Sequence, residues 1–159
     1  MEVNQENTNK SLPQNSVHQT LAHSYFLHFF ALILGVILDL IFHIRLVHSS
    51  IMMPIGFFLL FIATIIIVWA QITTKDLDKK EVTKEHLLKG PYCYTRTPTH
   101  YGLFLLILGF GFIMNAFFII LLSIFSVIFG KSVYLKKYEN IMLNKFGSIY
   151  EEYKKSVKI

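Results

Sequence analysis

The chain has 159 residues, of which 53% are hydrophobic and only 16% are charged, and its formal net charge is +5. Soluble domains carry about 25% charged residues and place some on every exposed helix. Here residues 21–72 hold two charges and residues 97–130 hold none, whereas residues 73–96 and 131–159 hold ten each. This distribution excludes a water-soluble fold and predicts an all-α protein that crosses the lipid bilayer several times.

The polar N-terminus and the single cysteine exclude further classes of protein. Residues 1–20 are rich in Asn and Gln, and we interpret them as a mobile tail ahead of one domain at 21–159. The tail lacks the basic start of a secretory signal peptide. Cys93 is the only cysteine, so there is no disulfide framework and no CxxC motif. The histidines at 18, 23 and 28, and those at 43 and 48, are spaced five residues apart, which scatters them around a helix, so no metal site is expected.

Two apolar runs predict the first two membrane spans. Residues 25–44 form a helix of about 30 Å, which is enough for one crossing. Residues 51–72 supply a second crossing, with Trp69 as an interfacial anchor near its end. Asp39 is the only acid within a span and lies one turn before His43. We expect these two side chains to form a local pair.

The third apolar block, residues 101–130, is long for one crossing and short for two. The flanking segments, 73–96 and 131–159, contain six and seven basic residues. The positive-inside rule prefers both of them in the cytoplasm. We therefore predict a helical hairpin that turns at Asn115, with spans at about 101–114 and 116–137. The protein would have four spans, with both termini and the 73–100 linker cytoplasmic. Within the third span, Gly109 and Gly111 are expected to serve helix packing.

The C-terminal segment is predicted to form an amphipathic cytoplasmic helix at the membrane surface. Its apolar side chains recur every four residues and share one helical face, with lysines opposite: Tyr134, Tyr138, Met142 and Phe146. Gly147 suits the end of this helix. Ser148 and Glu151 match a capping box, which would start another short helix through Tyr150 and Tyr153.

The linker before the third span carries the chemistry-bearing residues. Arg96 followed by Thr97 and Pro98 places a permanent cation and backbone N–H donors at the start of a helix. This arrangement suits an anion such as a carboxylate or a phosphate. The alternative interpretation is an anchor for lipid headgroups, because arginine and tyrosine are common at that membrane depth.

A set of motifs in order resembles the isoprenylcysteine carboxyl methyltransferase and phospholipid methyltransferase superfamily, whose members are integral membrane enzymes that use S-adenosylmethionine. The matching residues are Gly90-Pro91-Tyr92-x-x-x-Arg96-x-Pro98-x-x-x-Gly102, then an apolar hairpin, then Glu139 and Phe146-Gly147-x-x-Tyr150-x-x-Tyr153. The resemblance covers about residues 84–157. Three positions depart from the family pattern, which has a histidine at Thr97, a tyrosine at His100 and a glutamate at Tyr138.

The resemblance implies an S-adenosylmethionine site at the cytoplasmic membrane surface. Arg96 would neutralise the carboxylate of the cofactor, and Glu139 would accept hydrogen bonds from its amine or ribose. His100 would serve as a base if the acceptor is an amine. The acceptor is expected to be a lipid-like or prenylated small molecule with a carboxylate or amine, entering sideways between spans. The remaining cofactor-lining residues, carried over by position, are Leu87, Tyr92, Thr97, Pro98, Thr99 and His100.

Two other classes of function stay open on the sequence. A non-catalytic membrane scaffold would keep the fold and lose the chemistry, as the departures at Thr97 and Tyr138 suggest. A small-molecule transporter is less favoured, because the nearly uncharged spans offer no ion pathway. The +5 charge indicates attraction to the membrane surface rather than binding of nucleic acid, since the lysines flank the spans. The acceptor and the oligomeric state are not determined by these patterns.

Overall fold

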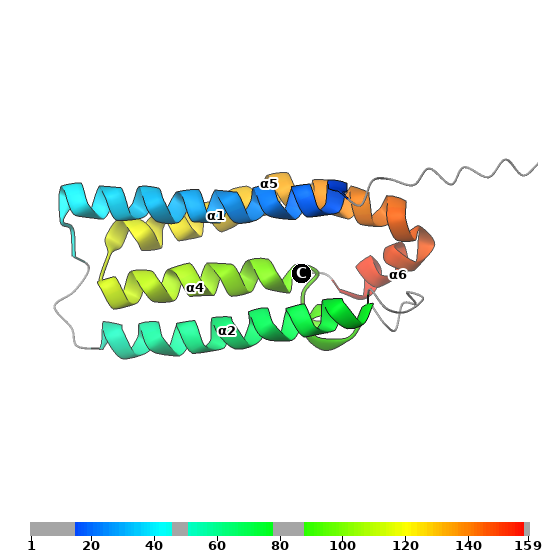
Figure 1. The fold of residues 1–159 in the computed structure, drawn as a ribbon, viewed down its shortest axis with the longest axis horizontal. Helices are drawn as coiled ribbons and strands as arrows, with labels where there is room; N and C mark the ends of the chain where they lie inside the picture. The colour runs from blue at the N-terminus through cyan, green and yellow to red at the C-terminus, as the bar shows by residue number, and fades with distance from the viewer. Residues whose placement is uncertain (1–14, 46–50, 78–87, 158–159) are drawn as a thin grey trace, which may run out of the picture.

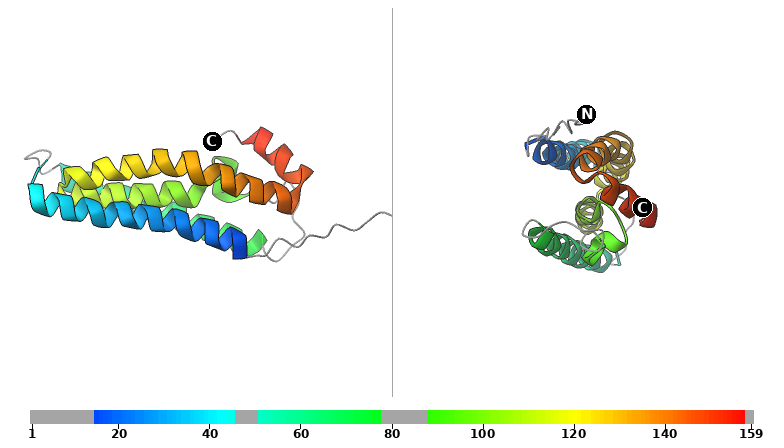
Figure 2. Two further views of the ribbon diagram at one scale, coloured as in Figure 1. Left: turned by 90° about the horizontal axis from the view of Figure 1, so that it is seen from above. Right: turned by 90° about the vertical axis from the view of Figure 1, so that its right-hand side faces the viewer.

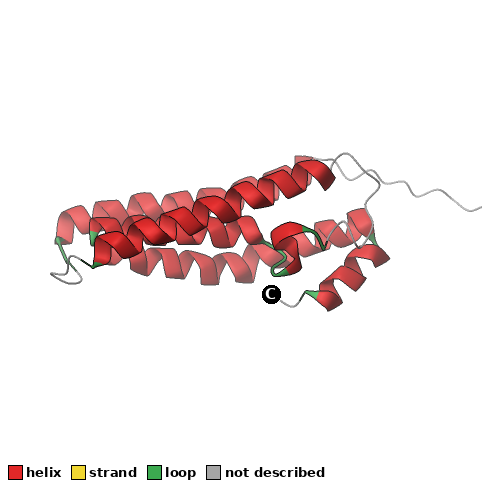
Figure 3. Cartoon of the chain, turned by 90° about the horizontal axis from the view of Figure 1, so that it is seen from below, coloured by secondary structure: helices red, strands yellow, loops and turns green. Residues whose placement is uncertain are grey.

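A computed structural model describes residues 15–45, 51–77 and 88–157, and all of its regular elements are helical (Figures 1 and 3). The predicted all-α class is therefore confirmed for this part of the chain. The elements are α1 (Asn15–Phe42), α2 (Met52–Leu77), the 3-10 helix η1 (Gly90–Cys93), α4 (Pro98–Met114), α5 (Phe117–Phe146) and α6 (Ser148–Ser156).

The four long helices form an antiparallel bundle with α4 in its middle (Figure 2). Helix α2 packs along α4, α1 packs along α5, and α4 also contacts α5. Helices α1 and α4 run in one direction, and α2 and α5 run in the other (Figure 1). The short elements η1 and α6 lie at the same end of the bundle, so this end gathers the linker and the C-terminal segment.

Three helices are long and apolar enough to cross a membrane. Their apolar stretches are Tyr25–Phe42, Met52–Thr74 and Phe117–Asn144. Large apolar side chains on their outer surfaces are exposed, for example Phe26 at 67% and Phe61 at 66%. A continuous apolar surface of this kind suits lipid and not water. The described helices are therefore compatible with a membrane protein.

The helix bounds differ from the predicted spans at three places. Helix α1 begins at Asn15 and not at Tyr25, so residues 15–20, which we assigned to the tail, are helical; residues 1–14 lie outside the described part. No glycine or proline interrupts the chain between Asn15 and Tyr25. Helix α4 begins at Pro98, which fits the first position of a helix. Helix α5 continues past residue 137 to Phe146, so the predicted fourth span and the aromatic segment are one helix.

The predicted turn between the third and fourth apolar helices is present at Asn115. This residue has left-handed backbone angles, φ 51° and ψ 42°. Its N–H donates to the Phe112 carbonyl at 3.1 Å, and the Ala116 N–H donates to the Gly111 carbonyl at 2.9 Å. These bonds satisfy carbonyls at the end of α4, and asparagine is one of the few residues that adopts this conformation readily.

Asp39 does not form the expected pair with His43. Its Oδ1 accepts a hydrogen bond from the Phe118 N–H at 3.1 Å, and its Oδ2 accepts one from the Ile119 N–H at 3.0 Å. Both donors lie in the first turn of α5, where backbone N–H groups lack a partner within the helix. The His43 Nδ1 atom lies 3.4 Å from the carbonyl of Ile41. The free N–H groups of a helix start attract a carboxylate more strongly than a neighbouring imidazole does.

Glycines allow the helix backbones to approach closely. A Cβ atom on Gly109 would lie 2.9 Å from the carbonyl oxygen of Gly56, so α4 and α2 meet backbone to backbone at this pair. A Cβ atom on Gly111 would lie 2.8 Å from Ile120 Cγ1 on α5. The predicted packing role of Gly109 and Gly111 is therefore confirmed.

Helix α5 ends at Gly147, as predicted. Gly147 has a positive φ of 54° and ends α5. The predicted capping box is wrong, because Gly147 is itself the N-cap and no side chain caps α6. The Gly147 carbonyl already accepts the N–H groups of Tyr150 and Glu151, so Ser148 lies inside the helix. The helix therefore starts one residue too early for Ser148 to act as its cap.

The aromatic face of α5 packs against α6 and not only toward the membrane surface. Tyr150, Tyr153 and Val157 are buried and form a small core. Met142 and Phe146, from the predicted amphipathic face, pack on this core. Apolar packing at this end therefore holds α6 beside the linker.

Candidate functional site

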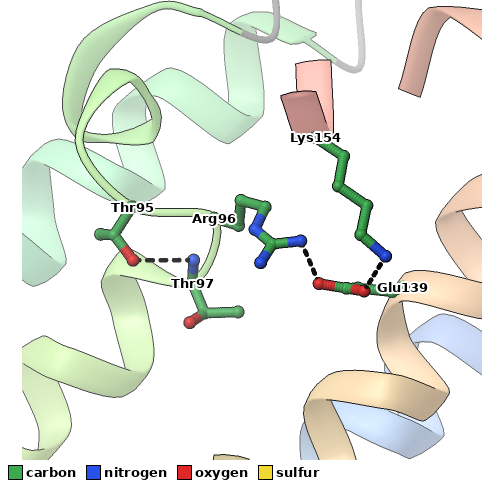
Figure 4. Close-up of polar contacts among 5 residues, drawn as sticks. All are labelled: Thr95, Arg96, Thr97, Glu139 and Lys154. Carbon is green, nitrogen blue, oxygen red and sulfur yellow. Dashed lines mark hydrogen bonds and ion pairs between the residues drawn. The ribbon is translucent and has the colours of Figure 1, made fainter. Parts of the chain in front are cut away.

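Three charged side chains from different elements meet at the end of the bundle that carries η1 and α6 (Figure 4). Arg96, just before α4, donates from Nη1 to Oε1 of Glu139 on α5. Lys154 on α6 donates from Nζ to Oε2 of the same carboxylate at 2.5 Å. The side chains of Arg96 and Glu139 are each 11% exposed, whereas that of Lys154 is 43% exposed. Two cations thus share one largely buried carboxylate, and one positive charge is in excess.

We call Arg96, Glu139 and Lys154 the charged cluster. Two buried polar atoms in or beside it have no hydrogen-bond partner among the described residues. They are the Nε atom of Arg96 and the hydroxyl of Tyr150. Tyr150 is 1% exposed, and its hydroxyl feels the charges of both Glu139 and Arg96. A buried donor without a partner costs free energy, so native proteins rarely keep one without a reason. Unpaired donors beside an excess positive charge suit a ligand that carries an anionic group.

Tyrosine hydroxyls connect η1 to α2 and α6. The Tyr153 hydroxyl donates to the Tyr92 carbonyl at 2.9 Å. The Tyr92 hydroxyl lies 2.9 Å from Thr74 Oγ1, whose own proton is donated to the Ala70 carbonyl. Tyr92 must therefore be the donor to Thr74. These bonds fix the linker between α2 and α6 directly beside Arg96.

Burial determines the protonation of the two α6 tyrosines. Burial and, to a smaller extent, the negative charge of Glu139 raise the pKa of Tyr150 to about 12, although Arg96 acts in the opposite direction. Burial also raises the pKa of Tyr153 well above its usual value. Both hydroxyls therefore keep their protons at physiological pH and act as neutral hydrogen-bond donors.

The linker backbone is held by glycine and proline. Gly90 has a positive φ of 60°, which favours glycine, and Pro91 is buried at the start of η1. Cys93 is exposed, with its Sγ near the Leu88 carbonyl. The loop that carries Arg96 therefore adopts a defined conformation.

The residues predicted to line a cofactor do not all lie together. Arg96 and Glu139 are in the charged cluster, whereas Thr99 and His100 lie toward α1. Pro98 is fully buried at the start of α4, and the Thr97 N–H donates to Thr95 Oγ1 at 3.3 Å. His100 turns toward α1, where its ring lies 5.7 Å from the ring of Tyr25. Thr99 also lies near Tyr25. Leu87 lies outside the described residues.

A cavity of about 410 Å³ lies between α1, α2 and α4. Tyr25, Gln71 and Thr99 line it with polar groups, and all three come from the helix ends nearest η1. Farther along the helices the walls are apolar, with Phe29, Leu103 and Leu106 among the lining residues. The volume is within the range of small-molecule sites. We call this cavity the α1–α2 groove.

Four side chains of these sites were not identified from sequence. Lys154 and Tyr150 reach the charged cluster from α6, and Tyr25 and His28 contact His100 from α1. Their partners lie far away in the chain, so no local pattern marks them. The one usable signal was Tyr150, which stands in the motif that carries the resemblance.

Comparisons of the chain with protein family models, curated proteins and solved structures find no match. Among the described residues, no group of three or more metal-binding side chains is gathered. A function for this chain is therefore inferred from the geometry of the charged cluster and the α1–α2 groove, together with the sequence motifs.

Proposed function

We propose that this protein is an integral membrane methyltransferase that moves a methyl group from S-adenosylmethionine to a lipid-like or prenylated small acceptor. One observation carries the proposal. Arg96 and Glu139 are the charged residues of two separate motif halves, and they meet in one ion pair although 43 residues separate them. Buried, unpaired donors lie directly beside that ion pair.

The charged cluster fits the amino-acid end of this cofactor. That end is a zwitterion, and the cluster offers both signs of charge. Arg96, with its unpaired Nε, and Lys154 would hold the carboxylate, and Glu139 would hold the ammonium group. The buried Tyr150 hydroxyl offers a further neutral donor. When bound, the cofactor supplies an electrophilic methyl group, so the protein needs mainly to align the acceptor and exclude water.

The α1–α2 groove supports a lipid-like acceptor. Its apolar walls suit a hydrocarbon chain, and its polar end at Thr99 is three residues from Arg96. An acceptor lying in this groove would have its polar group next to the charged cluster. Holding two reactants in line contributes about 7–11 kcal/mol to lowering a barrier in favourable cases. If the acceptor is an amine, His100 would take its proton.

The same proposal includes a four-span topology. Helix α4, with 17 residues, is about 26 Å long and lies within the bundle between α2 and α5. We place it as the third span, with α5 as the fourth. The basic segments on both sides would then be cytoplasmic, together with both termini and the charged cluster.

A second candidate function is a non-catalytic membrane scaffold. One observation favours it: Arg96 and Lys154 both form ion pairs with Glu139, so each of the three charges already has a partner within the protein. Such a set would also hold the linker, α5 and α6 together as a structural element. The two candidates differ in whether the cluster binds a ligand.

Calorimetry on the purified full chain in detergent tests the proposal. We expect S-adenosylmethionine to bind, and Arg96→Gln, Glu139→Gln and Lys154→Gln to weaken binding by about tenfold or more, as expected for lost charge-assisted bonds. Lys155→Gln is the matched control, because it removes an equivalent exposed charge from α6. Absence of binding at millimolar cofactor would favour the scaffold. If the cofactor binds, incubating membranes with radiolabelled cofactor would show whether the label enters lipid, protein or a small metabolite.

A further inference from the structure

The α1–α2 groove opens on an outer side of the bundle. Helix α1 packs along α5 and α2 packs along α4, so α1 and α2 form opposite walls with α4 as the floor between them (Figure 2). Ile107 on the floor is 3% exposed, whereas Phe29 on the α1 wall is 58% exposed. Both walls belong to apolar stretches that are long enough to cross a membrane. A molecule that occupies this groove would therefore enter from the bilayer.

The apolar part of the groove suits one hydrocarbon chain. Along α4 the lining extends from Thr99 to Ile107, which is about 12 Å of helix at about 1.5 Å per residue. A chain that leaves the bilayer for such walls gains little from burial, because lipid tails are as apolar as leucine. The head group of the occupant therefore determines which amphiphile the groove prefers.

The polar end of the groove carries hydrogen-bonding groups and no charge. Tyr25 and Thr99 contribute hydroxyls, and Gln71 contributes an amide. Each of these groups can donate and accept hydrogen bonds. Among the described residues that line the groove, none is Asp, Glu, Lys, Arg or His. Gln71 is exposed within the apolar stretch of α2, where an amide favours a hydrogen-bonding partner over hydrocarbon.

The charges of the charged cluster are directed toward α5 and α6. Arg96, three residues before Thr99, donates to Glu139 on α5. Lys154 approaches the same carboxylate from α6. These three residues do not line the groove. A charged head group in the groove would thus have no counter-charge on its walls, and an unpaired charge in hydrocarbon is disfavoured by about a hundredfold.

We propose that the α1–α2 groove binds a single-chain amphiphile whose head group is an uncharged hydroxyl, held at Tyr25, Gln71 and Thr99. A hydroxyl donates one hydrogen bond and accepts two, which matches a site with three polar groups. This inference rests on the proposed function in treating the occupant as the methyl acceptor, and it adds the class of that acceptor. Fatty carboxylates and long-chain ammonium ions are disfavoured, because the lining offers neither of them an opposite charge.

Photo-cross-linking on the full chain, held in discs of phosphatidylcholine bilayer, locates the occupant without any cofactor. The probe is 1-dodecanol with a diazirine near the end of its chain. We expect cross-links at Phe29, Leu103 and Leu106, and few at Phe61, which is 66% exposed on the outer surface of α2. Leu106→Trp fills the groove and should remove the label from Phe29. Equal labelling of Phe61 and the groove would contradict a site in the groove.

Competition at equal chain length tests the head group. Unlabelled 1-dodecanol should displace the probe at a concentration lower by about tenfold or more than dodecanesulfonate or dodecyltrimethylammonium, whose charges are permanent. Equal displacement by all three competitors would overturn the inference.

A charge placed at the polar end should change this preference. We expect Gln71→Lys to make dodecanesulfonate the stronger competitor, and Gln71→Glu to do the same for dodecyltrimethylammonium. Ile72→Lys is the matched control, because Ile72 is exposed at the same depth on α2 and does not line the groove. An order of competitors that stays unchanged in both Gln71 variants would also overturn the inference. Lack of cofactor binding in calorimetry would overturn the proposed function alone, since none of these readouts involves S-adenosylmethionine.

Discussion

The carboxylate of Asp39, near the end of α1, holds the backbone of Phe118 in the first turn of α5, 79 residues later. The adjacent Ile119 N–H bonds the other carboxylate oxygen at 3.0 Å. Asp39 thus links α1 to the start of α5, just after the turn that joins α4 and α5. This end of the bundle is opposite the charged cluster (Figure 1). A single acid in an apolar span has a structural role here, because α5 begins beside it.

Replacing Asp39 should weaken the fold by removing this cap. We expect Asp39→Ala to lower the free energy of unfolding by about 1–2 kcal/mol, as for other lost N-caps. Asp39→Asn should cost less, because its amide oxygen still accepts one hydrogen bond. His43→Ala is the control and should change stability by less than about 0.5 kcal/mol. Thermal unfolding in detergent measures all three, and equal losses for Asp39→Ala and His43→Ala would contradict the assignment.

The close approach of α2 and α4 predicts opposite effects for two glycine substitutions. In Gly109→Ala the new Cβ would lie 2.9 Å from the Gly56 carbonyl oxygen, so the backbones must move apart. We expect a loss of about 1–3 kcal/mol. In Gly130→Ala the nearest atom is 3.8 Å away, so the gain in helix propensity should stabilise by about 0.5–1 kcal/mol. The same sign for both variants in thermal unfolding would rule out the close approach.

The two buried tyrosines of α6 should respond differently to loss of their hydroxyls. Tyr153→Phe removes a bond to the Tyr92 carbonyl and should cost about 0.5–1.5 kcal/mol of stability. Tyr150→Phe removes a hydroxyl without a partner among the described residues, so stability should stay the same or rise slightly. Under the proposed function, Tyr150→Phe should nevertheless weaken cofactor binding. Thermal unfolding and calorimetry separate the two effects, and a large stability loss for Tyr150→Phe would show that its hydroxyl is already bonded.

The proposed four-span topology predicts that Asn115 and Cys93 face opposite sides of the membrane. Cys93 is exposed in η1, and Asn115 lies at the other end of α4. We expect a membrane-impermeant maleimide to label Cys93 from the cytoplasmic side only. Asn115→Cys in a Cys93→Ser background should be labelled from the other side only. Labelling of both positions from the same side would contradict this topology.

The features that depend on local chemistry could be predicted from the order of the residues. Uncharged runs of sufficient length dictate apolar helices, since each backbone group must be satisfied inside a helix in lipid. Asn115 and Gly147 mark turns because few residues adopt positive φ at low cost. Arg96 and Glu139 were recognisable as candidate site residues because their motifs have characteristic spacings.

The pairing of side chains that are distant in the chain depends on how the helices pack on one another. Asp39 caps α5 and does not bond its near neighbour His43, because the packing of α1 on α5 places free N–H groups beside it. The bond between His28 and Ser126 has the same origin. The apolar pattern of a helix indicates which face is buried. The hydrogen-bond partner of a polar side chain on that face comes from whichever helix packs against it. Contacts between helices depend on crossing and register, which no local pattern in this chain encodes.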